Sequence, residues 1–120
     1  MRVLTVLIMA MLAGCATTAT YTDAEMVQYD KHTHYSIAES PGGFTVDIYY
    51  SRYQFIPESG VVAEACLRQA KAIAWEHAET LGQGIEPVND QRVKLSTGRN
   101  GLSGITSCSA SAVVNFKSGV

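Results

Sequence analysis

The 120-residue chain has few charged residues, few cysteines and no long apolar run, and each shortage excludes a class of protein. Only 17% of its residues are charged and the net charge is −2, so the basic excess typical of nucleic-acid-binding proteins is missing. No polybasic segment offers a site for anionic lipid. The longest apolar run is about half of the ~20 residues that a membrane-spanning helix needs. The length suits one domain.

Motifs of catalysis and cofactor binding are also missing from the sequence. There is no Cys-x-x-Cys pair, no Cys/His spacing typical of zinc sites and no internal repeat. The serine-rich run 107–111 lacks the Gly-x-Ser-x-Gly spacing of a nucleophile elbow. Residues 98–104 are glycine-rich but carry no phosphate-loop lysine. We therefore predict a protein that is not an enzyme and has no cofactor, and an envelope hydrolase is the least favoured alternative.

The N-terminus has the layout of a secretory signal. Arg2 gives a single positive charge, Val3 to Leu12 give an apolar segment, and small residues lead to Cys15. The four residues Leu12-Ala13-Gly14-Cys15 resemble a bacterial lipobox. This resemblance to bacterial lipoproteins implies thioether lipidation of Cys15, cleavage before it and acylation of the new N-terminus. The alternative is an ordinary signal peptide that happens to contain a cysteine.

The residue after Cys15 is Ala16 and not Asp. Under the sorting rule of Gram-negative lipoproteins, this implies an outer-membrane protein, anchored by lipid and facing the periplasm. The sequence then divides into a signal peptide (1–14), a lipidated flexible tether (15–31) and a periplasmic domain (32–120). The tether is Thr-rich and lacks the apolar periodicity of a folded segment. Loss of Arg2 with the signal changes the net charge from −2 to −3.

Periodicity in the domain predicts two strands, a helix and two more strands. Strand patterns run from about Thr33 to Glu39 and from Phe44 to Phe55, separated by a Ser-Pro-Gly-Gly turn. A helix is expected from Ser59, as its cap, to Leu81, because Gly82 and Gly84 follow. Further strands are expected over 88–96 and 105–116, with the turn at 97–101.

The predicted fold class is α+β, with the order β-β-α-β-β. A four-stranded, mainly antiparallel sheet should carry one helix on one face, with the last strand beside the second. This layout, including an alanine-rich helix that carries a cysteine, is similar to that of small proteobacterial envelope lipoproteins of uncharacterised function.

Two cysteines remain once Cys15 is acylated. Cys66 lies on the apolar face of the predicted helix, and Cys108 lies on the small-residue face of the last strand. The helix and strand periodicities both direct the thiols to the interface between helix and sheet. In an oxidising compartment, we therefore predict that they form a disulfide. The alternative is two buried free thiols.

The predicted partner surface is the outer face of the helix. Trp75 lies among charged residues there, with Lys71 one turn before it and Arg68 a further turn back. An exposed tryptophan can mark an interface, and Trp and Arg dominate interface hot spots. The alternative is an arginine or lysine stacked on the ring without any partner.

The sequence thus predicts an interaction or accessory domain with an envelope protein as its possible partner, besides the lipid on Cys15. The alternative is a small-ligand or metal-binding lipoprotein that uses His32 and His34. A His-x-His pair places both rings on one side of an extended chain, but tight zinc or copper binding needs a third ligand. His77, the only other histidine, is expected on the inner face of the helix.

Overall fold

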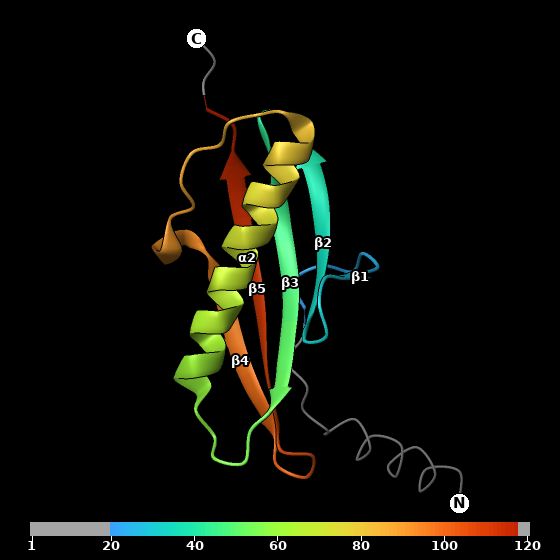
Figure 1. Cartoon of the computed structure of the whole chain (residues 1–120), viewed down its shortest axis with the longest axis vertical. Coiled ribbons are helices and arrows are strands. Elements are labelled where there is room, and N and C mark those ends of the chain that lie inside the picture. Colours follow the sequence, from blue (N-terminus) through green and yellow to red (C-terminus); the bar gives the residue numbers. More distant parts are fainter. Residues whose placement is uncertain (1–19, 118–120) are drawn as a thin grey trace, which may run out of the picture.

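The computed structural model describes residues 20–117, which form one helix packed on one face of a five-stranded antiparallel sheet (Figure 1). The strand order is β1-β2-β3-β5-β4. The elements in chain order are β1 (Val27–Gln28), β2 (Thr33–Ser40), β3 (Gly43–Tyr53), α2 (Ser59–Leu81), the 3₁₀ turn η2 (Asp90–Arg92), β4 (Lys94–Asn100) and β5 (Ile105–Asn115). The α+β class is confirmed, with one strand more than predicted.

The two longest strands, β3 and β5, lie at the centre of the sheet. Each has 11 residues, and they pair along their whole length, from Gly43 with Asn115 to Tyr53 with Ile105. The prediction that the last strand lies beside the second of the four predicted strands is confirmed. Alternate residues of β3 are large and buried against the helix, whereas the matching residues of β5 are mostly small. The buried residues on this face are Phe44, Val46, Ile48 and Tyr50 in β3 and Cys108, Ala110, Ala112 and Val114 in β5.

Helix α2 packs on the sheet through small side chains, as its pattern predicts. Ala70, Ala74 and Ala78 are buried, and their short side chains let the helix approach the sheet closely. The helix ends at Gly82, whose φ of 67° is left-handed and whose N–H bonds the carbonyls of Ala78 and Glu79.

The predicted cap at Ser59 is wrong. Glu58 occupies the N-cap position, and its side chain makes no capping hydrogen bond. The start of the helix is held instead by the side chain of Gln54. Its Oε1 accepts the N–H of Glu58 at 3.1 Å, and its Nε2 donates to the Glu58 carbonyl at 3.3 Å. These two bonds hold the N–H and the carbonyl of the N-cap residue, whereas a Ser cap would accept an N–H from the first turn of the helix.

The prediction of four strands is wrong because β1 forms within the segment assigned to the tether. Val27 pairs with Tyr35, and Gln28 pairs with His34. Asp30 reverses the chain between the two strands, since its Oδ1 accepts the N–H groups of His32 and Thr33. A turn stabilised by a side chain leaves no apolar periodicity in the sequence.

The third strand was predicted over 88–96, but β4 begins six residues later, at Lys94. Residues 90–92 form η2, capped by Asn89, whose side chain accepts the N–H of Gln91. The strand itself is Lys94–Asn100, and the turn moves to residues 101–104. Asn100 Oδ1 accepts the N–H of Leu102 at 3.0 Å, and Gly104, not Asn100, supplies the positive φ of 73°.

The face of the sheet opposite α2 is lined with polar residues. Ser107 and Ser109 of β5 and Asp47 of β3 alternate with the core residues and are nonetheless buried. Small side chains in central strands are shielded by their neighbours on the adjacent strands. Within residues 20–117, no helix is long and apolar enough to cross a membrane.

Candidate functional site

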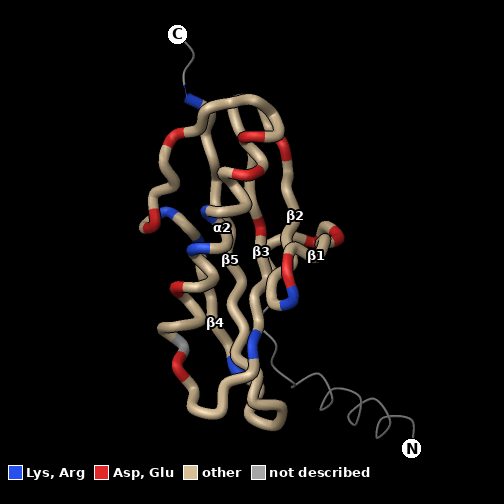
Figure 2. The backbone as a smooth tube through the Cα atoms, viewed as in Figure 1, with Lys and Arg blue, Asp and Glu red and all other residues tan. Residues whose placement is uncertain are grey.

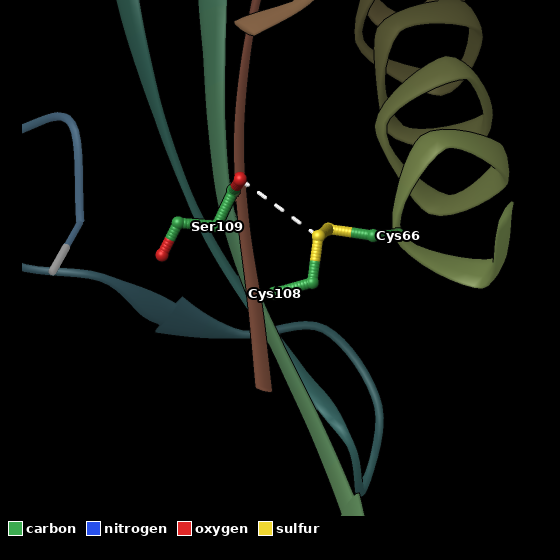
Figure 3. Close-up of a disulfide and its surroundings, with 3 residues drawn as sticks. All are labelled: Cys66, Cys108 and Ser109. Atoms are coloured by element: carbon green, nitrogen blue, oxygen red, sulfur yellow. Dashed lines mark hydrogen bonds between the residues drawn. A yellow bond between two sulfur atoms is a disulfide. The ribbon is translucent and has the colours of Figure 1, made fainter. Parts of the chain in front are cut away.

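A disulfide joins the helix to the centre of the sheet. Figure 3 shows Cys66 on α2 and Cys108 on β5 facing each other, with their Cα atoms 6.2 Å apart. Both residues are fully buried, and the bridging sulfur of Cys108 lies 3.8 Å from the carbonyl oxygen of Ser109. The disulfide predicted from the two periodicities is present. Its burial beneath the helix points to a structural role.

The predicted partner residues lie together on the outer side of α2. Arg68 and Trp75 are exposed, and the Trp75 side chain retains 49% of its accessible surface. Lys71 lies between them in sequence and forms an ion pair with Asp90 of η2. The predicted exposure of Trp75 is confirmed. We call Arg68, Lys71 and Trp75 the helix stripe.

The connection between α2 and β4 borders this stripe. The Lys71–Asp90 pair links η2 to the helix, and both side chains remain partly exposed, at 37% and 52%. An ion pair this exposed contributes little free energy of folding. Its effect is to occupy the Lys71 ammonium, so Arg68 is the cation of the stripe that is better placed for an external anion.

A small groove between α2 and β2 contains two further ionisable side chains of the helix, Glu76 and His77. The groove has a volume of about 160 Å³. Among its lining residues, the hydroxyl of Tyr29 donates to Glu76 Oε1 at 2.7 Å, and the Tyr29 ring meets that of Tyr35 edge-on with 6.0 Å between the ring centroids. The hydrogen bond to Glu76 raises the pKa of Tyr29, with a smaller contribution from burial.

His77 also lines this groove. Its Nε2 lies 3.1 Å from Glu39 Oε1 at the end of β2, and its ring stands edge-on to Phe44 at 4.7 Å. Sequence reasoning placed His77 on the inner face of the helix but missed the groove. Tyr29 and Glu76 are 47 residues apart, and no local pattern links them.

Asp30 connects the β1–β2 turn to the helix. Besides the two N–H groups bound by Oδ1, its Oδ2 accepts Nε2 of Gln69 at 2.9 Å. Partial burial opposes ionisation of this carboxyl group. The hydrogen bonds from the His32 N–H, from Thr33 and from Gln69 outweigh it and lower the pKa of Asp30.

The three histidines do not converge. His32 lies near Tyr50, with 6.1 Å between ring centroids, and His34 is exposed on β2. His77 contacts Phe44, six residues before Tyr50 on the same strand, which corresponds to about 20 Å. Among residues 20–117 no three His, Cys, Asp or Glu side chains are grouped so as to hold a metal ion.

A further hollow lies where the 86–93 segment passes the end of β5. It has a volume of about 480 Å³, and Glu86, Arg92, Val113 and Asn115 are among the residues that line it. Glu86 is held there by its N–H, which donates to the Asn115 carbonyl at 2.9 Å. Its lining mixes polar side chains with apolar ones.

Cys15 and the lipobox residues lie outside the described part of the chain, so the structure does not test them. Comparison of the sequence with protein-family models, with curated proteins and with solved structures gives no match.

Proposed function

We propose that the protein is a lipoprotein anchored in the outer membrane through acylated Cys15, and that its periplasmic domain is a non-enzymatic interaction module. Two features support the proposal. The Leu12–Cys15 segment resembles a lipobox, and the disulfide between Cys66 and Cys108 suits an oxidising compartment. The first of these carries the proposal.

Lipidation would give a firm anchor. Each buried CH₂ adds about 0.8 kcal/mol, and stable attachment takes more than one acyl chain. The thioether and amide chains that the resemblance implies at Cys15 meet that requirement. The domain would then need no membrane-spanning helix.

Cell fractionation of a Cys15→Ser variant tests the anchor. We expect the wild-type protein in the outer-membrane fraction, whereas the variant should lose its lipid and leave that fraction. Ala16→Asp is the matched control, because lipidation should persist while the sorting rule redirects the protein to the inner membrane. A Cys15→Ser protein that still sediments with the outer membrane would contradict the proposal.

The helix stripe is the partner surface that the proposal favours. The fold needs only the alanine-rich face of α2, so the exposed half of Trp75 gains no burial from the core. Arg68 lies two turns before Trp75 on the same side of the helix. An aromatic and an arginine on one exposed strip are the residue types that dominate interface energetics.

Crosslinking followed by capture from intact cells tests this surface. Trp75→Ala should weaken partner binding about tenfold or more, the effect of removing a hot-spot residue. The variant should fold normally, since exposed substitutions usually change stability by less than about 1 kcal/mol. Leu81→Ala is the control, because Leu81 is also exposed at 41% but lies on a different side of the helix. Unchanged capture by a folded Trp75→Ala protein would place the partner surface elsewhere.

A further inference from the structure

One end of the domain exposes a cluster of large apolar side chains. Phe55 and Ile56 lie in the loop between β3 and α2, and Leu102 lies in the turn between β4 and β5. Their exposed fractions are 84%, 68% and 96%. Tyr53, at the end of β3, adds a ring that is 64% exposed. Figure 1 shows both connections at the lower end of the molecule. We call these four residues the apolar end.

The two connections are held together by specific contacts. The N–H of Gln54 donates to the Gly104 carbonyl at 2.9 Å. The guanidinium group of Arg99 bonds the carbonyls of both Gln54 and Gly104, at 3.2 and 3.4 Å. A Cβ on Gly104 would lie only 2.6 Å from the Tyr53 ring, so that ring packs directly on the turn. The apolar side chains therefore project from a fixed framework.

The charged residues that border the apolar end are Arg52, Arg99 and Glu58, two positive and one negative. Residues 53–57 and 100–105 contain no charged side chain. Arg52 of β3 and Arg99 of β4 both pair with Thr106 of β5, which lies between them in the sheet. Figure 2 shows the two loops free of charge at their tips, with basic segments and an acidic segment just above them. Exposed apolar tips beneath arginines suit the interface of a bilayer with anionic headgroups.

The distance to the anchor favours the same end. Cys15 lies five residues before the first described residue, Thr20, and five residues span at most about 17 Å. The described chain enters the fold in its lower half, the half that carries the apolar end (Figure 1). β3 has 11 residues, so the far end of the sheet is about 35 Å from its lower end. A lipid on Cys15 is therefore attached on the half of the domain that carries the apolar end, which favours this end as the one that faces the membrane.

We propose that Tyr53, Phe55, Ile56 and Leu102 insert into the headgroup region of the membrane that holds the lipid, with Arg52 against the lipid phosphates. This inference rests on the proposed lipidation of Cys15. It orients the domain with its long axis away from the bilayer, so the helix stripe stands along the side of the domain.

Fluorescence quenching in vesicles tests the orientation. The full lipidated protein is reconstituted into phosphatidylethanolamine–phosphatidylglycerol vesicles, with or without bromine on the upper acyl carbons. Leu102→Trp in a Trp75→Phe background reports on the apolar end. Gln83→Trp in the same background is the matched control, since Gln83 is exposed just after the far end of α2. We expect a blue shift for Leu102→Trp and quenching several-fold stronger than for Gln83→Trp.

The contrary outcomes are distinct. An unquenched Leu102→Trp in protein that floats with the vesicles would overturn the orientation and leave the lipid anchor standing. Equal quenching of both reporters would also overturn it, because the domain would then lie flat. A blue shift without quenching would mean that protein, a partner or a second copy, covers the apolar end. A protein that does not float at all would contradict the lipid anchor and the orientation together.

Discussion

Asp30 shows how a single side chain can join three segments. It bonds two N–H groups of the β1–β2 turn and the side chain of Gln69 on α2, so the first strand, the turn and the helix depend on one carboxylate. Hydrogen bonds to a charged acceptor contribute more than neutral ones. We therefore expect the carboxylate to stabilise the N-terminal edge of the sheet.

This role gives the protein a predictable response to acid. Because folding lowers the pKa of Asp30, its contribution is fully present above the unfolded pKa of about 4 and disappears as the pH falls through the lower folded pKa. Asp30→Asn should cost on the order of 1 kcal/mol at neutral pH, and the difference from wild type should shrink below about pH 4. Urea unfolding at several pH values measures both effects.

Asp90→Asn is the control for this prediction. It removes an exposed ion pair with Lys71 and should change the free energy of unfolding by less than about 1 kcal/mol. An Asp30→Asn protein that is as stable as wild type at neutral pH would show that the neutral amide replaces the carboxylate fully.

At the scale of elements, the regular parts of the fold were predictable from the sequence. The period of 3.6 and the glycine at 82 predict α2 to its last residue, and the alternation of small residues predicts β5 beside β3. Strand β1 was missed and β4 was misplaced. Their ends are set by turns in which the side chains of Asp30, Asn89 and Asn100 accept backbone N–H groups. Such turns are local hydrogen bonds that periodicity does not record.

Of the candidate surfaces, one was predictable from the sequence and two were not. The helix stripe was predictable, because a Trp opposite an alanine-rich face stands out on a helical wheel. The groove at Tyr29 depends on a long-range contact, and the apolar end depends on loops that meet only in the folded chain. Phe55 and Leu102 are 47 positions apart in the sequence, yet their loops are joined through Gln54 and Gly104.

The disulfide links the helix to the sheet, and its reduction should destabilise the domain strongly. Cys66 and Cys108 close a loop of 42 residues, which corresponds to about 4 kcal/mol in the chain-entropy model. Small domains have about 5–15 kcal/mol in total, so the reduced protein should be only marginally stable. Urea unfolding with and without a reductant measures the difference.

A Cys66→Ala, Cys108→Ala variant is the matched control. It should unfold at the same urea concentration in the presence and absence of reductant, and close to the midpoint of the reduced wild type. Two free thiols in protein isolated without reductant would contradict the disulfide itself.

At the scale of the whole molecule, the two ends of the domain differ. The described chain begins in the half of the fold that carries the apolar end, whereas the last described residues lie at the opposite end (Figure 1). The helix stripe runs along the side between them. A lipid at Cys15 would account for this asymmetry, because it would place one end at the membrane and leave the side of the domain open to a partner.

The mass of the N-terminal peptide of the mature protein, isolated from membranes, tests this account most directly. We predict that the peptide begins at Cys15 and carries a thioether-linked diacylglyceryl group and an N-acyl chain. A mature protein that begins at another residue, or that retains a free thiol at Cys15, would contradict it.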